Sequence, residues 1–186
     1  MEDLTRIEMV NHLAQSIAAL EALQGFAQLV PEVGSNLVYC LPNATQLEEV
    51  AGLTGRIILV RGQPKTCGDV DFGWAPFMGL VVLAAHKMED SIRSAISLRC
   101  TSEIITACQM QGLELVEFRW PREQAPPNCL TLAALETLDY VPKALYDHGA
   151  HGLEALLVIF GKNPTTVVER VRLICEGLSE VGSVGE

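Results

Sequence analysis

The sequence predicts one α/β domain built in layers. Helical and strand patterns alternate along all 186 residues, and this order is typical of helices packed on the faces of a sheet. Hydrophobic residues make up 49% of the chain and charged residues only 19%, which is enough apolar material for one sizeable core. No internal repeat or clean domain boundary interrupts the pattern, so we expect a single folded body.

The first half is expected to start with a helix over residues 4–24. Apolar residues recur at helical spacing from Ile7 to Leu20, and Gly25 ends the run. We assign residues 1–25 to an N-terminal helix that packs on the domain and is a candidate dimer element. The elements expected next are a strand at 37–41, a short helix capped by Asn43, a strand at 56–60, a turn at 62–65 and a loop at 66–73.

The second half continues the alternation. A helix is expected over residues 75–88, where Pro76 is acceptable only in the first turn, and residues 121–130 carry three prolines typical of a surface connection. We expect residues 26–178 to form the α/β domain and residues 179–186 a flexible tail. The other expected elements are a short helix capped by Asp90, strands at 96–100, 113–118, 144–146 and 153–160, and helices at 101–112, 131–138 and from Pro164 to about Glu176.

The charge balance argues against nucleic-acid binding. Thirteen basic and 23 acidic residues give a net charge of −10 and a pI near 4.8, whereas non-specific nucleic-acid binding requires Lys and Arg that neutralise phosphates. A small anionic ligand would need a local group of cations. The best candidates are Arg56, Arg61 and Lys65, for which a solvated strand edge is the alternative interpretation.

The N-terminus and the cysteines indicate a cytoplasmic location. The first nine residues, M-E-D-L-T-R-I-E-M, are acidic and amphipathic, unlike a signal peptide. No apolar run is long enough to cross a bilayer, so we expect no membrane binding. The six cysteines are spread without any C-x-x-C pair, which is typical of core thiols in a reduced interior.

We predict no metal site. His148 and His151 have an H-x-x-H spacing in a loop, but no third ligand is evident, and zinc requires three or four. No phosphate-binding glycine loop or dinucleotide fingerprint is present. Trp74 and Phe77 are candidates for stacking on a heterocyclic ring, with burial beneath the loop as the other interpretation.

Residues 29–42, L-V-P-E-V-G-S-N-L-V-Y-C-L-P, place a special turn before a strand. Pro31 cannot sit inside a central strand, and Gly34 permits a positive φ or the close approach of a ligand. Ser35 and Asn36 then supply short polar side chains ahead of a buried run. An ordinary turn explains these residues as well as a binding wall does.

Taken together, several segments resemble the ThiN family of thiamine-phosphate synthases. They cover nearly the whole chain in one order and spacing, and the first of them is the most specific. The matching segments are L-V-P-E-V-G-S-N-L-V-Y-C-L-P-N-A (29–44), V-A-G-L-T-G-R-I (50–57), D-F-G (71–73), I-R-S-A-I-S-L-R (92–99), Y-D-H-G-A-H-G-L-E (146–154) and G-K-N-P-T-T-V-V-E-R-V (161–171).

The resemblance implies a three-layer α/β/α sandwich with a mixed central sheet, like class II aldolases (the AraD and HMP-PK C-terminal-like fold). It also implies a transferase that joins hydroxymethylpyrimidine diphosphate to thiazole phosphate, giving thiamine phosphate and pyrophosphate. No protein-bound cofactor is implied, although Mg²⁺ would accompany a diphosphate substrate. The implied partners are small phosphorylated thiamine precursors or thiamine phosphate, and a second copy of the chain in a homodimer.

The resemblance also assigns site residues. Arg56 matches the arginine of the family's G-R pair, a position tied to catalysis, and its planar guanidinium is suited to binding phosphate oxygens in pairs. The implied ligand-binding positions lie in four short segments. They are Gly34, Ser35, Asn36, Gly73, Asp147, Gly149, Gly152 and Glu154.

Three positions depart from the family pattern. Phe77 stands where the family has a histidine linked to catalysis, Leu153 where it has lysine, and Ala155 where it has proline. Phenylalanine can neither transfer a proton nor donate a hydrogen bond to a diphosphate. The losses at Phe77 and Leu153 together favour weakened or lost catalysis.

Three functional hypotheses therefore stand beside one another. The chain is an active thiamine-phosphate synthase, a non-catalytic domain that binds thiamine phosphate as a sensor, or a relative repurposed for another small ligand or for assembly. Arg56 and the glycine turns favour the first hypothesis, and Phe77 favours the second.

Overall fold

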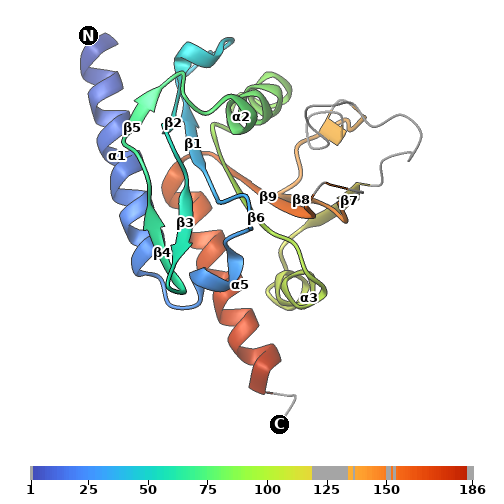
Figure 1. Cartoon of the computed structure of the whole chain (residues 1–186). Coiled ribbons are helices and arrows are strands. Elements are labelled where there is room, and N and C mark those ends of the chain that lie inside the picture. Colours follow the sequence, from blue (N-terminus) through green and yellow to red (C-terminus); the bar gives the residue numbers. More distant parts are fainter. Residues whose placement is uncertain (1, 119–133, 136, 150–151, 153, 184–186) are drawn as a thin grey trace.

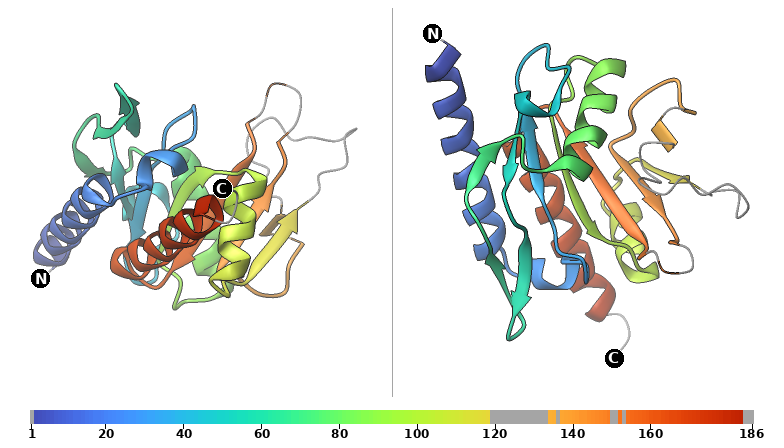
Figure 2. Two further views of the ribbon diagram at one scale, coloured as in Figure 1. Left: turned by 90° about the horizontal axis from the view of Figure 1, so that it is seen from below. Right: turned by 45° about the horizontal axis from the view of Figure 1, so that its top comes forward.

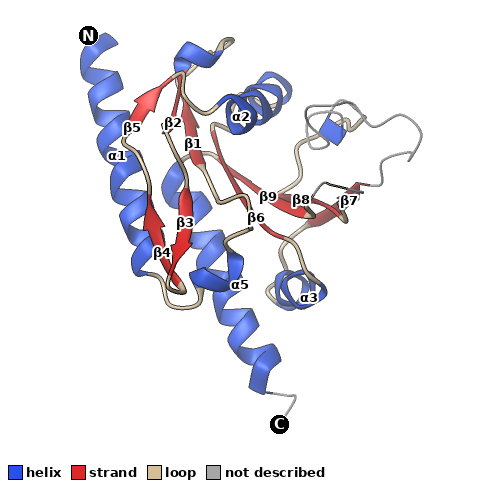
Figure 3. Cartoon of the chain, viewed as in Figure 1, coloured by secondary structure: helices blue, strands red, loops and turns tan. Residues whose placement is uncertain are grey.

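The computed structural model describes residues 2–118, 134–135, 137–149, 152 and 154–183 (Figure 1). Within these residues, a seven-stranded mixed sheet has helices on both faces (Figure 3). This arrangement confirms the predicted three-layer α/β/α sandwich with a mixed central sheet.

The sheet has the strand order β5-β2-β1-β6-β9-β8-β7. Every neighbouring pair is antiparallel except β7 and β8, which are parallel. A separate antiparallel hairpin joins β3 and β4. The strands are β1 (Leu37–Cys40), β2 (Val50–Leu53), β3 (Ile57–Val60), β4 (Gln63–Thr66), β5 (Val70–Phe72), β6 (Ser94–Arg99), β7 (Leu115–Phe118), β8 (Ala144–Asp147) and β9 (Leu156–Gly161).

The long helices divide between the two faces of the sheet. One face carries α1 (Glu2–Ala22), α5 (Pro164–Ser183) and α3 (Ser102–Met110), which lie side by side in Figure 2. The other face carries α2 (Pro76–Met88), which packs over β1, β2 and β6. Two short 3₁₀ helices lie in the connections: η1 (Phe26–Leu29) between α1 and β1, and η2 (Leu47–Glu49) between β1 and β2.

Helix starts follow the predicted chemistry in the second half of the chain. Pro76 occupies the first turn of α2. The Thr101 hydroxyl accepts a hydrogen bond from the Ile104 N–H at the start of α3, and the Asn163 side chain accepts one from the Thr166 N–H ahead of α5. These contacts satisfy backbone donors that the first helical turn leaves open.

Several local predictions in the first half were wrong. Asn43 does not cap a helix: it lies in a turn at φ 61°, and Gln46 with Glu49 forms the capping box of η2. Pro64 belongs to β4 rather than to a turn, where a two-stranded hairpin tolerates its missing N–H. The expected loop at 66–73 contains β5, which pairs only with β2 at the sheet edge.

Two further predictions failed later in the chain. Asp90 lies in a turn and starts no helix. The closing helix does not end at Glu176, because α5 continues to Ser183, so the tail expected from residue 179 is helical over 179–183. A Cβ on Gly177 would lie 2.9 Å from the Ala107 carbonyl oxygen, so this glycine permits close packing of α5 on α3. The proline-rich segment 121–130 and most of the helix expected at 131–138 lie outside the described residues.

The first helix is integral to the core. Met9, Leu13, Ile17 and Leu20 recur at intervals of three or four residues, and all are buried. The opposite side of the helix is exposed, with Ile7 57% accessible. No helix among the residues that the structure describes is long and apolar enough to cross a membrane.

Replacing Leu13 by alanine should lower the free energy of unfolding by about 2–5 kcal/mol, because the fully buried side chain leaves a cavity. Urea denaturation followed by circular dichroism measures the loss. The exposed Ile7→Ala is the matched control, for which a change within about 0.5 kcal/mol is expected. Equal small effects for the two variants would contradict an integral α1.

Candidate functional site

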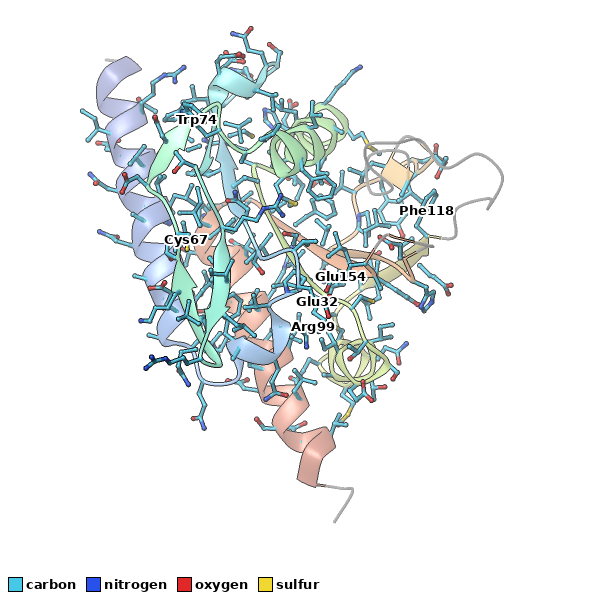
Figure 4. The ribbon with its side chains drawn as sticks, in the orientation of Figure 1. Glu32, Cys67, Trp74, Arg99, Phe118 and Glu154 are labelled. Carbon is cyan, nitrogen blue, oxygen red and sulfur yellow. The ribbon has the colours of Figure 1, made fainter. Side chains whose placement is uncertain are left out.

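The antiparallel register brings five strand ends to one end of the sheet. The start of β1 lies beside the ends of β2 and β6, and the start of β9 lies between the ends of β6 and β8. Figure 4 shows the labelled side chains of Glu32, Arg99 and Glu154 near one another at this end. The turn before β1 and the loop after β8 therefore meet in space, although they are far apart in the sequence.

A cavity of about 170 Å³ opens at this end between the sheet and the start of α2. Its wall combines a cation, two aromatic rings, small hydroxyl side chains and the first turn of a helix. The lining residues are Asn36, Thr54, Gly55, Arg56, Trp74, Ala75, Pro76, Phe77, Met78 and Ser97. Three positions that the resemblance had marked, Asn36, Arg56 and Phe77, thus share one cavity.

Asn36 is a structural part of the cavity wall. Its side-chain amide donates to the carbonyl oxygens of Leu53 at 3.0 Å and Gly55 at 3.2 Å, and its carbonyl accepts from the Leu53 N–H at 3.0 Å. Its backbone N–H donates to the Ser97 hydroxyl at 3.3 Å. Because both amide hydrogens are used internally, Asn36 fixes the Thr54–Arg56 wall and has no side-chain donor left for a ligand.

Arg56 is held at the cavity by the turn that precedes β1. Its guanidinium donates to the Val33 carbonyl oxygen at 3.0 Å. Gly34 has φ 79°, and a Cβ there would lie 3.0 Å from the Arg56 Cβ and 3.2 Å from its Cδ, so the turn leaves room for the arginine stem. No carboxylate in the described part of the chain pairs with Arg56, and most of its five donors stay available for an anion.

The first turn of α2 forms a second electropositive part of the wall. Ala75 occupies the N-cap position and gives no side-chain cap, and Pro76 follows it. The N–H groups at a helix start carry partial positive charge, which favours an anion in front of them. Arg56 and this turn line the same cavity, an arrangement suited to an anionic group.

Two aromatic side chains complete the cavity. Trp74 is 60% accessible, and Phe77 is half-buried; both line the opening. Flat faces of this kind pack against heterocyclic rings. No imidazole or carboxylate belongs to the lining residues, so Phe77 places a hydrocarbon ring where the family histidine was expected.

The other predicted binding residues lie outside this cavity. Gly73 has φ 81° directly before Trp74, and Ser35 is buried with a hydroxyl that has no partner among the described residues. Asp147 accepts a hydrogen bond from the Gly149 N–H at 2.7 Å. Gly152 faces open space. A ligand contact for these residues stays a prediction.

Burial shapes the titration of Asp147 and of its neighbour Cys100. Burial raises the pKa of the Asp147 carboxyl, while the N–H groups of Gly149 and Leu156 and the charge of His148 lower it. Burial, reinforced by the charge of Asp147, raises the pKa of the Cys100 thiol to about 12. Cys100 is therefore a protonated thiol at neutral pH and a poor nucleophile.

Glu154 reaches back to the turn before β1. Its carboxylate oxygens accept hydrogen bonds from the backbone N–H groups of Glu32 at 2.9 Å and Val33 at 3.1 Å. These partners are 122 and 121 residues away along the chain. Glu154 thus joins the loop after β8 to the turn that holds Arg56.

Metal binding has no support in the described residues, where no group of three or more His, Cys, Asp or Glu gathers around one point. His148 lies within 3.2 Å of the Glu117 carboxylate. His151 and Leu153 lie outside the described residues, so the H-x-x-H spacing and the departure at Leu153 stay untested.

Comparison with known families decides the assignment. A profile described as "Thiamine-phosphate synthase ThiN" matches residues 12–173. The chain belongs to the ThiN family. That match includes the turn before β1, Arg56, the start of α2 and the loop after β8, which are the segments that meet at one end of the sheet.

Two curated proteins extend this finding. The chain is 28% identical, over 92% of its length, to a bifunctional thiamine biosynthesis protein ThiDN of Methanocaldococcus jannaschii, and it spans only 41% of that protein. It is 25% identical to a thiamine-phosphate synthase ThiN of Methanothermobacter thermautotrophicus, over 86% of the chain and 88% of the relative. The region similar to this chain is thus part of a longer protein in the first relative and most of the protein in the second.

Solved structures support the same fold. The C-terminal domain of protein MJ0236 matches with a TM-score of 0.83 and 28% identity, over 95% of this chain and 98% of that one. The C-terminal domain of a phosphomethylpyrimidine kinase matches with 0.78 and 28%, over 90% and 98%. An L-fuculose-1-phosphate aldolase from Thermus thermophilus matches with 0.52 and 11%, over 93% and 94%, which confirms the class II aldolase-like fold alone.

Sequence reasoning missed Thr54, Ser97 and the backbone of the first turn of α2 as parts of the ThiN cavity. Ser97 lies within the family-like segment 92–99, but it is 61 residues from Asn36, which it contacts. The start of α2 carried a signal, because Ala75 and Pro76 begin a helix without a capping side chain. An uncapped helix start that shares a cavity with a cation favours a bound anion.

Replacing Asn36 by alanine should lower the free energy of unfolding by about 2–4 kcal/mol, because buried groups of Leu53 and Gly55 lose their partners. Denaturant titration measures the change, with the exposed Asn11→Ala as control, for which a change within about 0.5 kcal/mol is expected. A loss below about 1 kcal/mol at Asn36 would contradict its structural role.

Proposed function

We propose that the chain binds phosphorylated thiamine precursors in the cavity beside Arg56 and joins them into thiamine phosphate. The observation that carries the proposal is that Arg56 and the uncapped first turn of α2 line one cavity of a ThiN domain. These two groups would together bind the diphosphate of hydroxymethylpyrimidine diphosphate.

The bond changes of this reaction match the cavity's chemistry. The thiazole ring nitrogen forms a bond to the methylene carbon of the pyrimidine, while the bond from that carbon to the diphosphate oxygen breaks and pyrophosphate leaves. Negative charge grows on the leaving group, where Arg56 and the α2 N–H groups stabilise it. The attacking nitrogen carries no proton, so the displacement itself requires no general base.

Ring positioning is the task we assign to Trp74 and Phe77. Their aromatic faces border the anion-binding wall and would hold the pyrimidine and thiazole rings at reacting distance. Because no carboxylate belongs to the lining residues, a magnesium ion would enter on the diphosphate and would screen its charge. The homodimer, the cytoplasmic location and the absence of nucleic-acid binding stay predictions.

A second candidate function is favoured by Phe77 itself. Phe77 lines the cavity at the position where the family carries a histidine linked to catalysis. A cavity that keeps the phosphate-binding arginine and gains an aromatic ring is suited to holding thiamine phosphate without turnover. The chain would then act as a sensor or carrier domain.

The binding step is tested by calorimetry with thiamine phosphate and thiamine. Wild-type protein should bind thiamine phosphate with micromolar affinity and thiamine much more weakly. Arg56→Ala should weaken thiamine phosphate binding at least about tenfold, through loss of charge-assisted hydrogen bonds. Of the three cations that the sequence nominated, only Arg56 lines the cavity, so Arg61→Ala, at the turn of the β3–β4 hairpin, is the matched control and should leave the affinity unchanged. Equal binding of the two ligands would exclude phosphate recognition at this site.

Turnover separates the two candidate functions. Product formed by the wild-type chain from the two phosphorylated precursors and Mg²⁺, above the uncatalysed rate, would establish the synthase. Product formed only by Phe77→His, with a pH dependence near the ordinary imidazole pKa of about 6.5, would establish a binding domain that has lost the reaction. Phe77→Leu, which supplies no imidazole, is the control. If neither the wild-type chain nor either variant forms product, the cavity does not support this reaction.

A further inference from the structure

We infer that Glu154 is a positioning residue that sets the orientation of Arg56 through the turn before β1. Resemblance alone had marked Glu154 as a ligand-binding residue, but its carboxylate is bonded to protein backbone. The inference deepens the proposed function and rests on it only where ligand affinity is concerned.

The first step is the pair of hydrogen bonds that Glu154 accepts from the turn. Its two carboxylate oxygens accept from two consecutive N–H groups, those of Glu32 at 2.9 Å and Val33 at 3.1 Å. The Gly34 N–H donates in turn to the Pro31 carbonyl at 2.9 Å. Hydrogen bonds to an ionised acceptor are about twice as strong as neutral ones, so Glu154 fixes the peptide planes on both sides of Glu32. The next plane, which carries the Val33 carbonyl, is fixed by the bond from the Gly34 N–H to Pro31.

The second step is the hydrogen bond between the turn and Arg56. The Val33 carbonyl, in the residue whose N–H Glu154 holds, accepts from the Arg56 guanidinium at 3.0 Å. The turn is also anchored behind, because Ser35 and Ile57 exchange backbone hydrogen bonds at 2.9 and 2.8 Å. A shift of the Val33 peptide therefore moves the acceptor that orients the guanidinium at the cavity.

The third step is that the residues linking Glu154 to Arg56 are exposed to solvent. Val33 is 50% accessible, Arg56 is exposed, and Glu32 is exposed. The turn is buried on either side, at Pro31 and Gly34, and Glu154 supplies the side-chain hydrogen bonds to its exposed middle, the N–H groups of Glu32 and Val33. A carboxylate on the loop after β8 thus controls the geometry of a cation that is distant in the sequence.

A chemical readout tests this relay without any thiamine compound. Phenylglyoxal modifies guanidinium groups, and peptide mass spectrometry reports the rate at each arginine. Loss of the Val33 contact frees a guanidinium nitrogen that is now bonded to backbone, so Glu154→Gln should raise the modification rate of Arg56 about threefold or more. Arg61 in the same molecule should keep its rate. An unchanged Arg56 rate would overturn the inference.

The chain offers a matched control variant. The Glu49 carboxylate also accepts from two consecutive backbone N–H groups, those of Thr45 at 2.7 Å and Gln46 at 3.1 Å, but its turn does not hold Arg56. Glu49→Gln should leave the Arg56 rate unchanged. If Glu154→Gln fails to fold, Glu154→Asp replaces it, because it keeps the charge and withdraws the oxygens by one methylene. A rise with Glu49→Gln equal to that with Glu154→Gln would overturn the inference.

A double-mutant cycle then tests the link to ligand binding, with inorganic pyrophosphate and thiamine phosphate as probes. Glu154→Gln should weaken both probes about tenfold in the wild-type background and have no further effect when Arg56 is already alanine. Equal effects in the two backgrounds would show direct ligand contact by Glu154 and overturn the inference. If the wild-type chain binds neither probe, the proposed function fails, while the phenylglyoxal rates still decide the relay.

Discussion

The side-chain amide of Asn36 holds β1 and β2 together beyond the point where their backbone pairing stops. Direct pairing between the strands covers Tyr39 with Ala51 and Cys40 with Val50, and farther along Asn36 bonds the backbone of Leu53 and Gly55 instead. Because a side chain acts as the strand partner here, Thr54, Gly55 and Arg56 have no backbone partner on β1, and backbone pairing resumes between Ser35 and Ile57. This interruption leaves Arg56 at the cavity, just before the β3–β4 hairpin begins.

Sequence patterns were sufficient wherever one element's own residues determine its structure. The apolar stripe of α1, the proline that opens α2 and the Asn163 cap of α5 all act within a few residues. The patterns failed where a distant partner decides. Gly177 looks like a helix end in isolation, yet it lies inside α5 because α3 approaches closely at Ala107, and β5 is a strand only because β2 pairs with it.

The candidate site divides in the same way. Family resemblance placed Arg56 and Phe77 together, and the cavity contains both. It also marked Asn36 and Glu154, but no sequence pattern indicates that these polar side chains bond to backbone groups of distant turns. Ser97 and the first turn of α2 enter the wall through strand register and helix docking, which are properties of the folded sheet. Residue identity thus predicts which positions belong to the site, but it does not predict whether a side chain there contacts a ligand or the protein backbone.

The strand order has a consequence for how this site comes into being. Asn36 and Ser97 are 61 residues apart, and Glu32 and Glu154 are 122 residues apart. Contacts of such separation form slowly, because long loops must close before the contacts stabilise anything. The cavity walls therefore meet only when β1, β2, β6 and the start of α2 are in place, and the turn that holds Arg56 is complete only when Glu154 reaches it. A partly folded chain would have no partial pocket, and the appearance of ligand binding during refolding would mark the last step of folding rather than the first.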